Sequence, residues 1–354
     1  MCLAMRLKRV LHALILPLAL LCVPAFPVHA APAAKPLQVC VTVTDLGSLV
    51  REIGGDQVAV TVFAKGTENA HFVEARPSFV KALSIADLFV QTGMELEAAW
   101  APVLLQNSRN RKVLQGSAGF LDASAAITPL EVPTGTVDRS MGDVHPEGNP
   151  HYLLDPMNGL KVAQLIRDRL TELRPPKKTY FLDRYEAFRR KLAAAMVGEK
   201  LAAKYDVGRL ALLNEQGKLK PFLKERNEDS LLGGWLGRML PYYGTKVVAD
   251  HNMWPYFARR FGISVQGFLE PKPGVSPTTS HLGNLINRMR AEGIKFIIAT
   301  PYFDPKALKL VADKSGSRIV SLAHQVGGQR GADDYLGMIN FDVQALSSAF
   351  AETR

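Results

Sequence analysis

Three histidines and one aspartate lie on connections between predicted strands and helices, where side chains from distant parts of a chain can meet. His71 lies in TENAHFVEARPS, His151 in GNPHYLLDP and His251 in VVADHNMWPYF, and Asp304 has a similar place in IIATPYFDPK. Three neutral imidazole nitrogens and one carboxylate make a suitable tetrahedral ligand set for zinc. The residue types therefore predict a metal site, provided that the fold brings these four side chains together.

The elements that must position these residues alternate between apolar strands and amphipathic helices. Nearly continuous apolar runs of this kind are typical of strands in parallel sheets that are covered on both faces. Alternation of strands with helical patterns indicates α/β architecture. The predicted strands are 37–44, 58–63, 86–93 and 112–115 in the first half of the chain, and 245–250, 264–270, 295–300 and 318–323 in the second.

The two groups of strands predict two α/β lobes, each a parallel sheet flanked by helices. A long helical stretch from Met157 to about Lys204, interrupted by Pro175-Pro176, separates them. We expect an N-terminal lobe over residues 31–175, a linking helix over 176–204 and a C-terminal lobe over 205–354. In open parallel sheets, ligands bind outside the carboxyl ends of the strands. The four candidate ligands would then meet in the cleft between the lobes.

The first thirty residues have the features of a signal peptide. Arg6, Lys8 and Arg9 precede an apolar run that ends near Cys22, and Val28-His29-Ala30 offers a small-residue cleavage site. The run is shorter than the roughly 20 residues that a membrane-spanning helix needs. We therefore predict export with cleavage of residues 1–30, which leaves 324 of the 354 residues.

Composition narrows the possibilities for the exported chain. Only Cys40 remains, so no intramolecular disulfide can form, and its apolar context LQVCVTVT suggests a small buried side chain. The formal charge of +10 falls to +7 without the three basic leader residues. No basic stripe is interleaved with aromatic residues, which argues against nucleic acid as a partner.

Several segments carry a resemblance to a known family. They are HFVEARPS (71–78), ADLFVQTGMELEAAW (86–100), NPHYLLDP (149–156), DHNMWPYFARRFG (250–262) and the segment 301–305. From residue 38 to about 350 the chain resembles the cluster A-I solute-binding proteins of ABC transporters, the periplasmic zinc and manganese receptors. The resemblance implies two lobes beside a long backbone helix, and one divalent metal ion in the cleft. His71, His151 and His251 match metal-binding histidines, and Asp304 matches the aspartate that completes the site in some members.

The implied function is capture of periplasmic zinc by a monomer that delivers the metal to a membrane permease, without enzymatic activity. Three nitrogens and one oxygen suit zinc better than manganese, which prefers oxygen-rich sites, so a manganese receptor is the nearest alternative. Two positions depart from the pattern: Thr300 stands where many members have glutamate, and Asn252 where many have aspartate. Because imidazole binds metal only when neutral, we expect binding to weaken below about pH 6.5.

Other interpretations remain open at this stage. A zinc hydrolase would need an open coordination position and a general base, for which Glu74 is the only obvious residue. An adhesin or chaperone with a structural metal is a further possibility. Among neighbouring residues, we expect Asp155 to cap a helix, and Glu74 to bind either the His71 ring or a helix start. His145 is either a transient capture ligand or a residue that positions its turn, and His324 follows the last strand without a recognisable motif.

Overall fold

The structure is a computed structural model that describes residues 35–135, 144–272 and 274–353. The predicted signal peptide, residues 1–30, lies outside the described residues. The chain divides into residues 1–35 and a compact unit over residues 36–354, and the description below concerns the second unit. No helix in the described ranges has the length and apolar content required to span a membrane.

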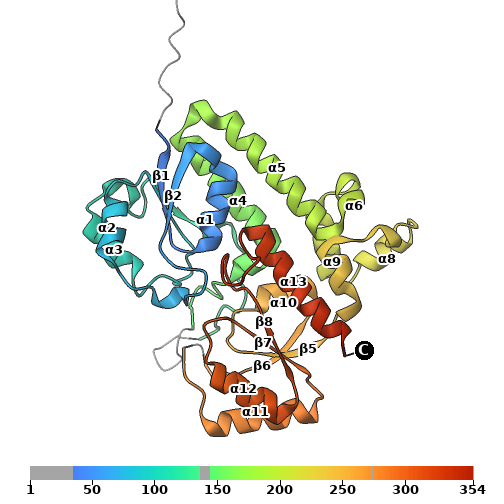
Figure 1. The fold of residues 1–354 in the computed structure, drawn as a ribbon. Helices are drawn as coiled ribbons and strands as arrows, with labels where there is room; N and C mark the ends of the chain where they lie inside the picture. Colours follow the sequence, from blue (N-terminus) through green and yellow to red (C-terminus); the bar gives the residue numbers. More distant parts are fainter. Residues whose placement is uncertain (1–34, 136–143, 273, 354) are drawn as a thin grey trace, which may run out of the picture. The chain divides into compact units, whose positions relative to one another are not determined.

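The first sheet has four parallel strands in the order β2-β1-β3-β4 (Figure 1). Buried apolar side chains of β1 and β3 explain why the strands form here, since both lie inside the sheet with helices packed against it. The strands are β1 Leu37–Val41, β2 Val58–Val62, β3 Leu88–Gln91 and β4 Phe120–Asp122, and the helices that follow the first three are α1 Thr44–Gly54, α2 Pro77–Ser84 and α3 Ala101–Ser108.

One predicted strand of this sheet is wrong. Residues 112–115 were expected to form a strand, but Arg111–Val113 form a short 3₁₀ helix, and the fourth strand is β4. A run of four apolar and polar residues does not distinguish a strand from a turn. Gly119, just before β4, passes so close to the backbone that an added Cβ would meet the Lys112 carbonyl oxygen at 2.4 Å. A side chain at this position would therefore clash with the 3₁₀ segment, and the strand begins only after the glycine.

The second sheet repeats the same arrangement, with all four strands parallel in the order β6-β5-β7-β8. Its strands follow the predicted runs closely. They are β5 Lys246–Ala249, β6 Ser264–Phe268, β7 Phe296–Ala299 and β8 Arg318–Ser321, and the helices between them are α10 Pro255–Phe261, α11 Thr279–Ala291 and α12 Pro305–Ser315. Figure 1 shows α11 and α12 on one side of this sheet, with α13 on the other.

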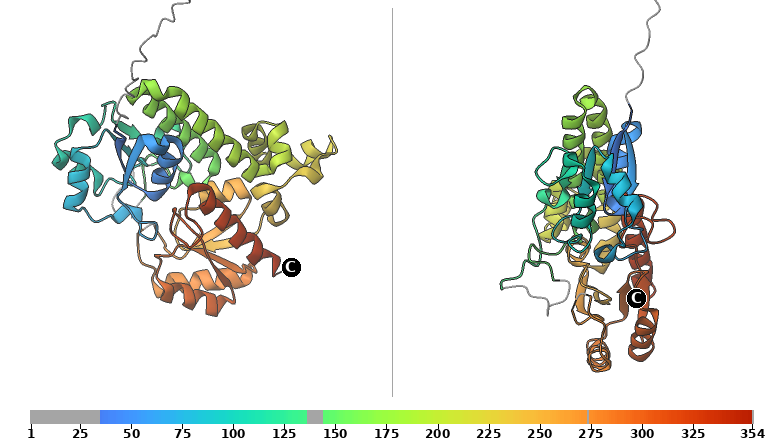
Figure 2. Two further views of the ribbon diagram at one scale, coloured as in Figure 1. Left: turned by 45° about the horizontal axis from the view of Figure 1, so that its top comes forward. Right: turned by 90° about the vertical axis from the view of Figure 1, so that its left-hand side faces the viewer.

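The long helical region joins the two halves. Helix α4 spans Pro156–Leu173, and the Pro175-Pro176 pair forms a short 3₁₀ turn that starts α5, Lys178–Val197. Helix α5 contacts α1 near one sheet and α9 near the other, and Figure 2 shows it alongside α4. Shorter helices and a C-terminal helix complete the chain: α6 Glu199–Lys204, α7 Val207–Glu215, α8 Leu219–Lys224, α9 Gly234–Met239 and α13 Tyr335–Ala351.

The predicted architecture is confirmed: two parallel sheets flanked by helices, with a long helix between them. The exact lobe boundaries at residues 175 and 204 stay predictions. One hydrophobic cluster includes residues from both sheets, such as Val39 and Val90 in the first and Val247 and Ile298 in the second. Both sheets therefore pack on a shared core.

Candidate metal centre

The fold brings three of the four predicted ligands together. One ligand atom from each of His71, His151 and His251 lies within 4.8 Å of the other two. The ring centroids are 5.3 Å apart for His71 and His151, 5.9 Å for His71 and His251, and 5.7 Å for His151 and His251. Zinc–nitrogen bonds of 2.0–2.1 Å place tetrahedral ligand nitrogens about 3.4 Å apart. Small side-chain movements are therefore sufficient to close these rings around one cation.

His71 is oriented by the residue two positions before it. It lies in a short 3₁₀ helix, Ala70–Phe72, beyond the end of β2. The Asn69 Oδ1 atom accepts hydrogen bonds from the His71 backbone N–H at 3.1 Å and from ring Nδ1 at 2.8 Å. The other ring nitrogen, Nε2, lies 3.0 Å from Nε2 of His145 and is the one available to a metal. Glu74, expected either at this ring or at a helix start, is exposed and pairs with Arg76 at 3.5 Å.

His251 is oriented by a carboxylate from the neighbouring strand. It follows β5, and its Nδ1 lies 2.7 Å from Oε2 of Glu270, which follows β6. The His251 backbone N–H donates to Asp250 Oδ1 at 2.7 Å. The second Asp250 oxygen accepts from the backbone N–H and the hydroxyl of Thr300, at 2.6 and 2.7 Å. Thr300 therefore supports the turn that carries the histidine.

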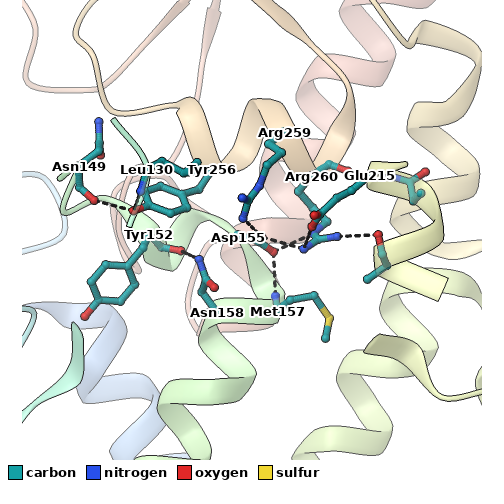
Figure 3. Close-up of polar contacts among 12 residues, drawn as sticks. Leu130, Asn149, Tyr152, Asp155, Met157, Asn158, Glu215, Tyr256, Arg259 and Arg260 are labelled. Atoms are coloured by element: carbon teal, nitrogen blue, oxygen red, sulfur yellow. Dashed lines mark hydrogen bonds and ion pairs between the residues drawn. The ribbon is translucent and has the colours of Figure 1, made fainter. Parts of the chain in front are cut away.

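His151 precedes a short 3₁₀ turn, Tyr152–Leu154, and α4. Its backbone N–H donates to Asn149 Oδ1 at 3.0 Å, and the Tyr152 hydroxyl donates to the Thr92 carbonyl at 2.6 Å. The Tyr256 hydroxyl, from α10, donates to the Asn149 carbonyl at 3.0 Å and accepts from the Leu130 N–H at 2.9 Å (Figure 3). Contacts from several elements thus fix the segment around His151.

The end of this segment is anchored by a buried ion pair. Asp155 caps α4 as predicted, since its Oδ1 accepts the Met157 N–H at 2.9 Å. Its two oxygens also accept from Nε and Nη2 of Arg260 at 2.8 and 2.9 Å, and Figure 3 shows this pair between α4 and α10. Arg260 contacts Glu215 at 2.6 Å as well. Asp155 and Arg260 are both buried, so this pair joins two elements in the interior.

Asp304 does not join the three histidines. Within the described ranges, the group of possible metal ligands contains His71, His151 and His251 alone. Asp304 is exposed, and its Oδ1 caps α12 by accepting the Lys306 N–H at 2.9 Å. It borders a groove of about 500 Å³ that Asn69 and Glu270 also line. A carboxylate placed just before Pro305 satisfies the start of a helix, which explains its position.

Two other histidines approach the cluster. His145 Nε2 lies 3.0 Å from His71 Nε2, and His145 lines a pocket of about 250 Å³ together with His151 and His251. His324 is buried, and its Nε2 lies 3.1 Å from the Glu68 carbonyl oxygen, while its Nδ1 has no hydrogen-bond partner among the described residues. His324 and His151 line a smaller cavity of about 30 Å³. His324 follows β8 just as His251 follows β5. This position after a strand is the sequence signal that could mark His324 as a candidate ligand.

Burial keeps these rings neutral. Desolvation, followed by repulsion from neighbouring histidines, holds the pKa of His71 and that of His151 well below the usual 6.5. Desolvation also lowers the pKa of His145 and that of His324 to about 4. Neutral imidazole is the form that coordinates metal, so these four rings need not lose a proton at pH 7 before binding.

Comparison with known proteins places the chain in a family. The model of the family described as "Zinc-uptake complex component A periplasmic" matches residues 39–203 and 237–349. The manganese-binding lipoprotein MntA of Halalkalibacterium halodurans is 22% identical over 319 residues, covering 89% of each chain. The high-affinity zinc uptake system protein ZnuA of Yersinia pestis is 23% identical over 297 residues, covering 79% of this chain and 80% of the relative.

Solved structures show the same fold. A crystal structure of ZnuA has a TM-score of 0.62 at 24% identity, covering 89% of this chain and 99% of that one. A periplasmic metal-binding protein from Candidatus Liberibacter asiaticus, solved with manganese, has a TM-score of 0.61 at 18% identity over the same share of this chain.

The family match and the fold are those of a solute-binding receptor for a divalent metal. The chain belongs to the family of periplasmic zinc-uptake components, the metal-binding, substrate-binding proteins of ABC importers. Proteins of this class deliver metal ions to a membrane permease. Relatives named for zinc and for manganese both occur among the matches.

Proposed function

We propose that this protein is a periplasmic high-affinity zinc receptor that hands its metal to the permease of an ABC importer. The observation that carries the proposal is the cluster of His71, His151 and His251, whose ligand atoms lie within 4.8 Å of one another. The leader predicted over residues 1–30 supports export, and we propose a monomer with lobes divided near residues 175 and 204.

The choice of zinc over manganese rests on the donor set. Imidazole nitrogen suits zinc, whereas manganese prefers carboxylate, carbonyl and water oxygens. Three histidines converge, and Asp304, the expected oxygen donor, caps α12 instead. We propose that a fourth histidine takes its place. The candidacy of His145 is supported by the 3.0 Å distance between its Nε2 and that of His71. The candidacy of His324 is supported by its buried Nδ1, which has no hydrogen-bond partner in the part of the chain that the structure describes.

A receptor fits the site better than a hydrolase. Metal hydrolysis needs a base beside the metal-bound water. Glu74, the predicted base, is exposed and pairs with Arg76, whereas the orienting groups on His71 and His251 are Asn69 and Glu270. Manganese remains the alternative cargo, because the relative MntA is named for that metal.

Calorimetry with metal-stripped protein tests the function. We expect one tight zinc site in the wild type and its loss in a His71→Ala, His151→Ala double variant, since both donors are removed. His281→Ala is the matched control, because His281 lies on α11 with its ring against the Phe268 carbonyl. Full zinc affinity in the double variant, or tighter binding of manganese than zinc by the wild type, would contradict the proposal.

The fourth donor is identified by comparing three single variants. His145→Ala and His324→Ala are each measured against Asp304→Ala for zinc affinity. We expect one histidine variant to lose at least tenfold in affinity, because a closed four-ligand site becomes open. Asp304→Ala should keep zinc affinity and lose about 1 kcal/mol of stability, as expected for a lost helix cap. A large loss of zinc affinity in Asp304→Ala alone would restore the aspartate as ligand.

A further inference from the structure

Glu270 supplies the one carboxylate that is hydrogen-bonded to a ring of the three-histidine cluster within residues 35–135, 144–272 and 274–353. Its Oε2 lies 2.7 Å from Nδ1 of His251. The equivalent ring nitrogen of His71 is bound by the neutral amide oxygen of Asn69. The two histidines are thus oriented in the same way, but by groups of different charge.

The sheet fixes the position of Glu270. Strands β5 and β6 are parallel neighbours, and their pairing continues beyond the strand ends. The Leu269 N–H donates to the Ala249 carbonyl at 2.8 Å, and the Glu270 N–H donates to the Asp250 carbonyl at 3.0 Å. The carboxylate also accepts the Gly274 N–H at 3.0 Å, and its side chain is only 18% exposed. It is therefore held beside His251 before any metal arrives.

A charged acceptor has two effects on this site. It fixes the tautomer with the proton on Nδ1 and makes Nε2 a stronger base. It also places a negative charge beside the largely buried imidazole rings. A divalent cation bound there would otherwise have little negative charge nearby to balance its own. A more basic nitrogen strengthens bonds to zinc more than bonds to manganese, because nitrogen ligands favour the metals later in the divalent series.

We propose that Glu270 is a positioning residue that sets the preference of the site for zinc over manganese, acting through the Nδ1 hydrogen bond of His251. The inference rests on the proposed function, because it concerns the metal that the receptor captures. Glu270 itself does not bind the metal.

The test compares Glu270→Gln and Glu270→Ala with the wild type. Glutamine keeps an oxygen acceptor and removes the charge, whereas alanine removes both. Zinc and manganese dissociation constants are measured by competition with a chelator of known affinity, and the cobalt-loaded proteins are compared by visible absorption. We expect zinc affinity to fall about 10–100-fold in Glu270→Ala, the usual cost of losing such a partner, and by less in Glu270→Gln. Manganese affinity should fall less than zinc affinity in both, and the cobalt spectrum should shift in both.

Glu292→Gln is the matched control, because Glu292 is also a carboxylate held by partners, Lys246 and Arg288, but on the surface. Unchanged zinc-to-manganese ratios in both Glu270 variants, with cobalt spectra like the wild type, would overturn the inference. So would a change in Glu270→Ala alone, because the charge would then have no role. If the wild type itself lacks a tight zinc site, the proposed function fails rather than the role of Glu270.

Discussion

His71 and His251 each commit one ring nitrogen to orientation and leave the other for metal. Asn69 and Glu270 accept the Nδ1 protons, at 2.8 and 2.7 Å. Imidazole donors held in this way lose little rotational freedom on binding, and the correct tautomer is already present. At the scale of single residues, the affinity of the site therefore depends on these acceptors as well as on the histidines.

The first prediction concerns pH. Burial lowers the pKa of His71 and of His151 well below 6.5, so both rings remain neutral when the pH falls through that value. Zinc affinity should therefore change little between pH 7.5 and 6.5, and proton competition should begin only at lower pH. The fourth-donor candidates, with pKa values lowered to about 4, should likewise stay neutral at pH 6.5. Competition titrations across pH 7.5–5.0 check this, and a tenfold loss per pH unit starting at 6.5 would contradict it.

At the scale of elements, the segment 149–155 ties His151 to both halves of the fold. The Tyr152 hydroxyl donates a hydrogen bond to the Thr92 carbonyl, just beyond β3. Asp155 and the Asn149 carbonyl accept hydrogen bonds from Arg260 and Tyr256 of α10. The Tyr335 hydroxyl, from α13, donates to the Leu153 carbonyl at 2.7 Å. His151 therefore cannot move independently of α10, and its distance from His251 is set by packing.

The second prediction concerns the buried ion pair between Asp155 and Arg260 and uses the variant Arg260→Met. The change leaves Asp155 and Glu215 without their buried cation, so unfolding free energy should fall by about 3–5 kcal/mol. Urea unfolding of the metal-free protein measures the loss. Arg259→Met is a close control, because Arg259 is 38% exposed and 3.9 Å from Asp155, and should cost less than about 1 kcal/mol. Equal losses in the two variants would show that the buried pair has no special role.

Elements with strong patterns could be predicted from the sequence. Apolar runs located seven of the strands, and histidines at the carboxyl ends of β2 and β5 were recognisable from position and type. The short run 112–115 carried too little signal to exclude a turn. Asp304 stays a prediction as a ligand, since an aspartate before a proline is equally a helix cap and serves as one here. Glu270 was not identified because its role depends on register between β5 and β6, which a single sequence does not specify.

At the scale of the molecule, one core lies under both sheets. The same cluster contains Val41 of β1 and Ala249 of β5, together with side chains of α4, α5 and α13. Shared burial of this kind favours cooperative unfolding of residues 36–354 rather than separate melting of two lobes. Metal bound where histidines from both halves meet should then stabilise the whole unit.

The third prediction follows from this linkage. Zinc at a free concentration one thousandfold above its dissociation constant should raise the free energy of unfolding by about 4 kcal/mol, because only the folded chain binds it tightly. Scanning calorimetry with and without buffered zinc should show one transition that moves upward as a whole. His71→Ala is the control and should show a smaller shift. Two transitions, of which only one moves with zinc, would be inconsistent with a core shared by both sheets.

The packing around Cys40 has a further chemical consequence. This residue of β1, the free cysteine of the described ranges, is buried beside Phe63 and Phe89, and desolvation raises the pKa of its thiol to about 12. The thiolate is the form that attacks disulfides, reacts with oxidants and captures soft metals. Cys40 therefore stays protonated, so this thiol of the described ranges neither competes with the imidazoles for cargo nor offers a handle for covalent dimerisation.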